Sequence, residues 1–286
     1  MSTILIIEQI LNGLQFGIML FLMAAGLTLI FGVMGLINLA HGSLYMMAAL
    51  AAAALAGAIV EIVVIRRLYA AAHLDQVLAT FALILVFSEG TRWVFGSFPL
   101  FLDVPSYLSG PITLPGGIQY PLYRLALIVI GLLVAFGLWW LTVRTRLGVQ
   151  IRAGENDREM IAALGVDISK LYTIVFALGA ALAGLAGALV GAIQSVQVGM
   201  GEPVLILAFV VIVIGGIGSI KGAFIGAILV GLTDTLGGIF LPQFFKLFME
   251  AGAATQTGSA LASMAVYVLM GLVLIWRPTG LFGARS

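Results

Sequence analysis

Long apolar runs separated by short polar segments form the pattern of this chain. The runs approach the ~20 residues that a bilayer-spanning helix needs, and they lack the strict alternation over about ten residues that marks a strand of a membrane barrel. We therefore expect an all-α, polytopic membrane helical bundle, a single transmembrane domain over residues 1–286, with about eight spans in a range of seven to nine. The expected helices lie near residues 10–32, 44–65, 77–96, 122–141, 171–197, 203–219, 222–241 and 259–276.

The first part of the chain allows two arrangements. The stretch LINLAHGSLYMMAALAAAALAGAIVEIVVI fits either one span or a re-entrant piece followed by a span. Orientation is usually taken from Lys and Arg in short loops, but neither residue type occurs before Arg66. The side of the membrane on which the N-terminus lies is therefore left open by the sequence.

Composition identifies the solvent as a bilayer. The mean hydropathy is +1.21 and only 9% of residues are charged, against about 25% in a typical soluble domain. The chain has no cysteine, which excludes disulfides, thiol catalysis and thiolate metal sites.

Two polar segments differ sharply in charge. The segment 97–121 holds five of the eight prolines and is expected to be an irregular loop, because proline sustains neither helix nor ladder hydrogen bonds. It contains no Lys or Arg, whereas the segment 142–170 contains Arg144, Arg146, Arg152, Arg158 and Lys170. By the positive-inside rule we expect 142–170 and the C-terminus to be cytoplasmic and 97–121 to be external. Glu61, close to Arg66, is expected at the cytoplasmic interface.

The sequence IRAGENDREMIAALGVD, residues 151–167, gathers charge between two apolar spans. Asn156 is expected to cap a short helix that has Glu159 as its third residue, and Gly165 is expected to end it. The apolar residues expected on one side of this helix are Met160, Ile161 and Leu164. The charged residues would face water or a partner protein. The alternative is a solvated helix that only holds the adjacent spans apart.

Small residues recur in the apolar runs. A face that repeats every four residues predicts close packing between helix backbones, and its members are Gly179, Ala183, Gly187 and Gly191. The run GGIGSIKGAFIGAILVG predicts a tight turn between two helices, around Lys221.

Polar residues within the spans need an explanation, because a charge at the bilayer centre costs about 2.5 to 3.5 kcal/mol on insertion scales. Asn38, His41 and Ser43 in INLAHGS would either line a solute path or form a polar cap at a helix entry. Asp234 in GLTDTLGG would either line the path or bond to a neighbouring helix.

The sequence gives little support for an enzymatic function. HExxH, GxSxG and a carboxylate-rich cluster at membrane depth are absent from the sequence. The phosphate-binding motif GxxxxGK[ST] is also absent, because the three lysines follow Ser169, Ile220 and Phe245. We expect no catalytic residue, no metal site, no cofactor and no nucleotide site in this chain.

Three stretches resemble a known family. RAGENDREMIAALGVDISKLYTIVFALGAALAGLAGALVG resembles the cytoplasmic coupling loop and following helix of ABC importer permeases, specifically the LivH-type branched-chain amino acid permeases. GLTLIFGVMGLINLAHGSLYMM resembles the N-terminal segment of that family, and GGIGSIKGAFIGAILVG its later glycine-rich turn. The three stretches stand in the family's order over nearly the whole chain.

The resemblance implies a multi-pass inner-membrane subunit that forms half of a translocation path for branched-chain amino acids or related small polar solutes. It implies pairing with a second permease subunit, two ATP-binding cassette subunits that hydrolyse ATP, and an extracytoplasmic solute-binding protein, with membrane lipid around the chain and no nucleic acid. The coupling residues that it implies are Arg152, Glu155, Asp157, Arg158, Glu159, Ala162, Ala163 and Gly165. The substrate-path candidates are Asn38, His41, Ser43 and Asp234.

One departure from the family concerns the segment before Arg66. Family members have a further apolar stretch between the parts that match LYMMAAL and IVEIVVIRRLY, where this chain has only a few alanine-rich residues near 50–58.

Two other functions stay open on the residues alone. One is an ion-coupled secondary transporter that uses Asp234 or Glu89. The other is a membrane assembly subunit without a translocation path.

Overall fold

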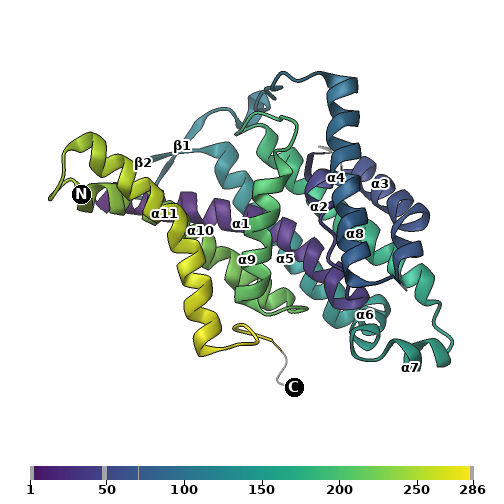
Figure 1. Cartoon of the computed structure of the whole chain (residues 1–286). Helices are drawn as coiled ribbons and strands as arrows, with labels where there is room; N and C mark the ends of the chain where they lie inside the picture. The colour runs from purple at the N-terminus through teal and green to yellow at the C-terminus, as the bar shows by residue number, and fades with distance from the viewer. Residues whose placement is uncertain (1–2, 47–49, 70, 284–286) are drawn as a thin grey trace.

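The computed structural model describes residues 3–46, 50–69 and 71–283, and its architecture is helical (Figure 1). Six of the described helices are long and apolar enough to cross a membrane: α1 (Thr3–Met34), α4 (His73–Phe95), α5 (Leu122–Arg144), α8 (Ile168–Gly191), α10 (Ile220–Phe245) and α11 (Ala251–Trp276). Two shorter apolar helices are α3 (Leu50–Val63) and α9 (Gly201–Gly215). These eight correspond in order to the eight apolar runs, so the helical membrane fold expected from the sequence is confirmed.

Short elements connect the spans. The helices among them are α2 (His41–Met46), α6 (Arg146–Asn156) and α7 (Arg158–Ala163). Single 3₁₀ turns lie at Ile65–Leu68 and Ser106–Leu108. The strands β1 (Pro111–Leu114) and β2 (Ile118–Pro121) form an antiparallel hairpin.

Helix α1 is the central element, with α5, α8, α9 and α10 packed around it (Figure 1). Its most extensive contact is with α10, where a Cβ added to Gly17 would lie 2.6 Å from the Ala227 carbonyl oxygen. Only a residue without a side chain lets the two backbones approach this closely, which is how helices associate in lipid. Helices α4, α5 and α11 instead leave most of their surface open to lipid or to partner subunits.

The two ends of α1 lie on opposite sides of the molecule. Near its start, the Asn12 Oδ1 atom accepts hydrogen bonds from Tyr120 of β2 (3.2 Å) and Arg124 of α5 (2.7 Å). Past its end, a Cβ on Gly35 would lie 2.6 Å from Nη2 of Arg158 in α7. The N-terminal end of α1 is therefore on the hairpin side, and its C-terminal end is on the side of α6 and α7.

The stretch after α1 follows neither of the two expected arrangements, because it crosses once as a broken segment and then returns as a helix in the opposite direction. The chain from Gly35 to Ala40 is not helical. Helix α2 then runs along α8 toward the hairpin side, with His41 beside Gly179 and Tyr45 beside Gly187. Helix α3 runs back along α8 toward the α6–α7 side, because its Gly57 lies beside Ala180 and its Glu61 bonds to Thr173. Residues 47–49 lie outside the described residues.

The expectation of a wholly irregular loop at 97–121 was wrong, because this segment contains the β1–β2 hairpin. The paired register places Pro111 opposite Pro121, at the open end of the hairpin. Proline at the outermost rung of a two-stranded ladder removes no interior hydrogen bond, so it terminates the strands without preventing them. Gly116 and Gly117, both with positive φ, form the turn.

The glycine-rich turn between α9 and α10 is confirmed. Gly216 and Gly218 have positive φ, and the Ser219 hydroxyl accepts a hydrogen bond from Gly222 N at 3.0 Å as the cap of α10. The C-terminal segment joins this turn, since Leu281 N and Phe282 N donate to the last carbonyls of α9 at 2.8 and 2.9 Å. The end of the described chain therefore lies on the same side as α6 and α7.

Candidate functional site

Helices α6 and α7 form a compact pair outside the long spans. Asp157 begins α7, and its Oδ1 accepts a hydrogen bond from Met160 N at 2.9 Å. The expected cap was Asn156, which instead ends α6. Both residue types accept such a bond, and the choice falls one residue later because Asn156 N still belongs to the preceding helix while Asp157 has extended backbone angles.

Gly165 ends the short helix as the sequence predicted. Its φ is +87°, its N–H donates to Ala162 O at 3.0 Å, and the next N–H, of Val166, donates to Ile161 O at 3.3 Å. This pair of bonds is the Schellman arrangement that closes a helix through a left-handed residue. Asp167 then caps α8, and its hydrogen bonds from the Lys170 backbone and side chain lower the pKa of the Asp167 carboxyl.

The exposed surface of this pair combines charged and apolar groups. The expected grouping of three apolar residues on one side was wrong for Ile161, which is buried against the bundle, while Met160 is 59% and Leu164 is 76% exposed. The predicted coupling residues that are exposed are Arg152, Glu155, Asp157, Arg158, Glu159, Ala162, Ala163 and Gly165. We call the surface of α6 and α7 formed by these eight residues, Met160 and Leu164 the coupling surface.

Two residues of the coupling surface also reach back to α1. The Glu155 carboxylate lies between Gly32 of α1 and Gly218 of the glycine-rich turn, and burial raises the pKa of this carboxyl. The Arg158 guanidinium lies against Gly35, the residue that follows α1. Both residues were expected to face only water or a partner. The structure shows that they also lie against the C-terminal end of the central helix.

A second group of predicted residues lies in the interior. Asn38 and His41 are both 0% exposed and Ser43 is buried. The side-chain nitrogen and oxygen atoms of Asn38 have no hydrogen-bond partner among the described residues, and the His41 ring, which lies beside the Met23 backbone, makes no hydrogen bond of normal geometry there. His41 packs at the crossing of α1 and α8, where its Nε2 would lie 2.9 Å from a Cβ on Gly26. Buried polar atoms are normally paired, so these groups are candidates for contact with water or solute.

Asp234 is not part of this interior group. It lies three residues after Gly231, which packs against Gly13 and Gly17 near the start of α1. His41 packs at Gly26, and thirteen helical residues separate Gly13 from Gly26, or about 20 Å along the axis. The four predicted path residues therefore form one group of three and one distant acid.

The burial of two polar residues, Thr28 and Glu61, was not predicted from the sequence. Thr28 of α1 is 1% exposed, and its hydroxyl has no partner among the described residues. Glu61 does not face the interface as expected, because its side chain is fully buried and bonds to Arg66, Tyr69 and Thr173. A lone Thr in an apolar run gave no signal, and the partner of Glu61 in α8 is 112 positions away.

Metal ligation receives no support from the described part of the chain. Within residues 3–46, 50–69 and 71–283, no group of three or more His, Cys, Asp or Glu side chains is placed to hold a metal ion.

These features together define a multi-pass helical membrane protein with a short helix pair, α6 and α7, packed against the end of a central span. The sequence profile of the family described as "Branched-chain amino acid transport system / permease component" matches residues 51–276. The chain belongs to this family. The match favours an ABC importer permease over the secondary transporter and the assembly subunit.

Individual relatives agree with the family match. The permease protein BraD of a high-affinity branched-chain amino acid transport system in Pseudomonas aeruginosa is 30% identical, over 97% of this chain and 95% of that protein. LivH of Salmonella typhimurium is 26% identical over the same shares. The fructose import permease protein FrcC of Rhizobium meliloti is 33% identical over 37% of this chain and 31% of that protein. No solved structure matches the chain.

The alignment with BraD is longer than the chain itself. It extends over 319 positions, against 286 residues here, so BraD contains insertions relative to this chain. This agrees with the expectation that the chain is shortened relative to the family.

Proposed function

We propose that the chain is the half-path subunit of an ABC importer that receives the movement of an ATPase through the coupling surface. In this arrangement α6, α7 and the C-terminus are cytoplasmic, and the β1–β2 hairpin is external. The charge difference between 142–170 and 97–121 supports this orientation. The N-terminal end of α1, on the hairpin side, is then external.

The observation that carries the proposal is the combination of exposure and attachment in α7. Met160 and Leu164 present apolar side chains beside charged Glu159, which is the composition of an element that inserts into a groove on a partner. The same helix lies against the end of α1 at Arg158 and Gly35. A force applied to α7 therefore reaches the central span directly.

The segment that follows the end of α1, inside the bundle, forms the proposed solute path. The non-helical chain from Gly35 climbs past Asn38 to His41, so a displacement of the α1 end also moves these two buried polar groups. Irregular backbone at membrane depth is tolerated where it is buried in protein or lines a water-filled cavity. Asn38, His41 and Ser43 line the path in this proposal. Asp234 lies apart and is left as an interhelical residue.

The solute class follows from the relatives and from the chemistry of the path. BraD and LivH are named for branched-chain amino acid transport. The uncharged polar side chains of Asn38 and Ser43 suit a zwitterion with an aliphatic side chain, because they leave no fixed charge to trap either of its ends. We assign branched-chain amino acids or similar small solutes, delivered by an extracytoplasmic solute-binding protein. A second permease subunit completes the path.

The sharpest test is to disturb the turn that ends α7 without disturbing the bilayer. Gly165→Val places a β-branched residue at a φ of +87°, which costs about 1 to 2 kcal/mol and redirects the helix end. We expect normal membrane insertion, loss of ATPase co-purification or of coupled ATP hydrolysis, and loss of concentrative uptake. Glu159→Arg, which inverts a charge offered to the partner, is expected to weaken ATPase binding in the same assay.

The matched control is Gly116→Val in the hairpin turn. Gly116 has a φ of +95°, and a Cβ at either Gly116 or Gly165 would meet open space, so the two substitutions impose similar backbone strain on opposite sides of the chain. Uptake at the wild-type rate in Gly165→Val, with the ATPase retained, would show that the coupling surface is only a solvated loop. A nucleotide photolabel that reacts stoichiometrically with the purified chain alone would contradict the proposal that only the partner subunits bind ATP.

A further inference from the structure

A cavity of about 510 Å³ lies between the end of α2, the end of α4 and the loop before α9. Its wall consists mainly of aliphatic and aromatic side chains, and none of the described residues that line it is charged. Two of its lining residues, Leu100 and Val196, exchange backbone hydrogen bonds of 2.8 Å, which joins the loop before α9 to the segment 97–121. The cavity is therefore on the hairpin side, and we call it the hairpin-side cavity.

A narrow polar crevice continues from the deep end of this cavity. The two spaces share Met46 of α2, and the crevice is also lined by Ser43 of α2, Ser88 of α4 and Glu202 in the first turn of α9. Helices α2 and α4 both run toward the hairpin side, so Ser43 and Ser88 lie deeper in the bundle than Met46 and the end of α4. The crevice has no room for a water molecule, so it is closed in this structure.

The polar groups of the crevice have no partners within the described chain. Ser43 is only 5% exposed, and neither its hydroxyl nor that of Ser88 makes a hydrogen bond there. The Glu202 carboxylate is also unpaired among the described residues, whereas the nearby charges of α4, Glu89 and Arg92, pair with each other at 2.6 Å. An occupant that donates hydrogen bonds and carries a positive charge would satisfy these groups, and a primary ammonium has three such donors.

The crevice leads directly to the proposed solute path. Helices α2 and α9 meet beside it, where a Cβ on Gly42 would lie 2.8 Å from the Gly201 carbonyl oxygen. His41 immediately precedes Gly42, so the buried polar residues of the path begin where the crevice ends. Transporter solute sites are often built at such interrupted helices.

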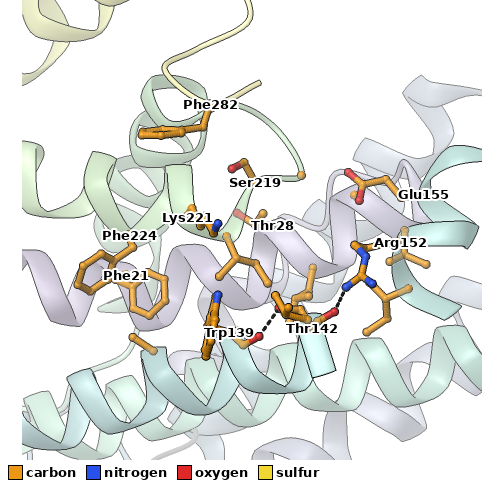
Figure 2. A pocket seen from close by; sticks show the side chains of 18 of the residues that line it. Phe21, Thr28, Trp139, Thr142, Arg152, Glu155, Ser219, Lys221, Phe224 and Phe282 are labelled. Atoms are coloured by element: carbon orange, nitrogen blue, oxygen red, sulfur yellow. Dashed lines mark hydrogen bonds between the residues drawn. The ribbon is translucent and has the colours of Figure 1, made fainter. Parts of the chain in front are cut away.

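Another cavity, of about 500 Å³, opens on the α6–α7 side between α1, α5, α6 and α10, and Figure 2 shows Thr28 among the side chains that line it. This cavity does not continue the path. Gly26 of α1 faces His41, and Thr28 lies two residues, or about 200° around the helix, from Gly26. The central helix therefore separates this cavity from His41, whereas the hairpin-side cavity leads toward His41 through the polar crevice.

We propose that the hairpin-side cavity receives one aliphatic α-amino acid before it enters the path, with the side chain against the apolar wall and the ammonium directed to Ser88 and Glu202. Met46, which lines both spaces, then separates the received solute from Ser43 and the path. The inference rests on the proposed function, from which it takes the solute class. Glu202 is exposed, and an exposed carboxylate attracts an ammonium only weakly, so the solute is oriented without being trapped.

The test is photolabelling of the full-length chain in nanodiscs with photo-leucine, a leucine analogue that carries a diazirine in its side chain, followed by peptide mapping. We expect labels within residues 86–102 and 196–198 that excess leucine removes. The same diazirine acid without the α-ammonium is expected to label these segments about threefold less or weaker still. Glu202→Gln is expected to lower labelling by photo-leucine to the level of this acid, while labelling by the acid stays unchanged.

Matched controls separate the site from general effects of charge and size. Glu250→Gln removes an exposed acid that likewise lies at the start of an apolar helix, α11, but outside the cavity, and is expected to label as wild type. Gly90→Phe fills the cavity, since Gly90 lines it and a Cβ there meets nothing within 4 Å, and is expected to abolish the leucine-sensitive labels. Gly137→Phe, equally free of neighbours but on α5, is expected to keep them. Each variant is first checked for monodispersity by size exclusion.

The proposal is overturned if leucine does not remove the labels, because a lipid or detergent chain then occupies the cavity. It is also overturned if Glu202→Gln keeps the wild-type preference for the probe with an ammonium, because Glu202 then only stabilises the start of α9. Leucine uptake by the assembled importer is measured separately. Wild-type uptake without leucine-sensitive labels removes this site and leaves the proposed function, whereas such labels in a chain whose assembly takes up no leucine remove the proposed function.

Discussion

The buried carboxylate of Glu61 offers the sharpest energetic prediction. It accepts hydrogen bonds from Arg66 Nη2 at 2.9 Å, from the Tyr69 hydroxyl at 2.7 Å and from the Thr173 hydroxyl at 2.7 Å, which joins the end of α3 to the first turns of α8. The Glu61 side chain is 0% exposed and that of Arg66 is 38% exposed. The two members of the ion pair therefore differ in their access to water.

This difference in exposure determines how much each substitution lowers the free energy of unfolding. Removing one partner of a buried ion pair costs about 3 to 5 kcal/mol, because it leaves the other charge buried and uncompensated. Arg66→Met leaves the Glu61 carboxylate in that condition, and we expect about 3 to 5 kcal/mol. Glu61→Met leaves Arg66, which can turn to water, but it also leaves the Tyr69 hydroxyl without its acceptor, so we expect about 1 to 3 kcal/mol. The double variant removes both charges and is expected to be no less stable than Arg66→Met alone.

The assay is denaturant-induced unfolding of the purified chain in mixed micelles, followed by tryptophan fluorescence, for the wild type and the three variants. The double-mutant cycle gives the coupling energy between Glu61 and Arg66 directly. Losses that add in the double variant would refute the reasoning, as would a larger loss in Glu61→Met than in Arg66→Met. Thr173→Val serves as the control that removes one neutral donor, with an expected loss of about 1 to 3 kcal/mol.

Two further predictions concern packing and sidedness. Gly17→Leu places a side chain where the α10 backbone lies 2.6 Å from the new Cβ, so we expect a loss of about 1 to 3 kcal/mol or more in the same unfolding assay, while Gly137→Leu, which meets open space, stays near wild type. In sealed vesicles, an impermeant maleimide is expected to label Ile4→Cys and Ser109→Cys from one side and Glu159→Cys from the other. Labelling of Ile4→Cys from the Glu159 side would contradict the direction of α1.

The spans were predictable because their signal is local. A run of about 20 apolar residues has few stable alternatives in a bilayer, and each of the eight runs became a helix. The fate of residues 36–65 was not local. Hydropathy does not distinguish one span, a re-entrant piece followed by a span, or two opposite crossings. The outcome depends on small residues of α8, such as Gly179 and Gly187, that let α2 pack closely.

The site was predictable only in part for the same reason. Gly165 could be assigned because a left-handed helix end favours glycine, and its neighbours alone decide the geometry. The cap differed by one residue because Asn156 and Asp157 are equally suited to the task. Arg158 and Glu155 were expected to be solvated, since the sequence does not show that Gly35 and Gly218 lie beside them.

In the proposed function, the arrangement of α1 explains how the helix pair α6 and α7 acts on the interior of the bundle. A continuous helix of 32 residues is about 48 Å long and moves as one body, and its N-terminal part is held by hydrogen bonds from Tyr120 and Arg124 to Asn12. Its other end lies against Arg158 and Glu155 of the coupling surface. The proposal therefore has α7 displace the C-terminal part of α1 while the end on the hairpin side stays in place. The segment that follows has no helical hydrogen bonds to resist the change, so the displacement is absorbed there, at the residues that carry the buried polar groups of Asn38 and His41.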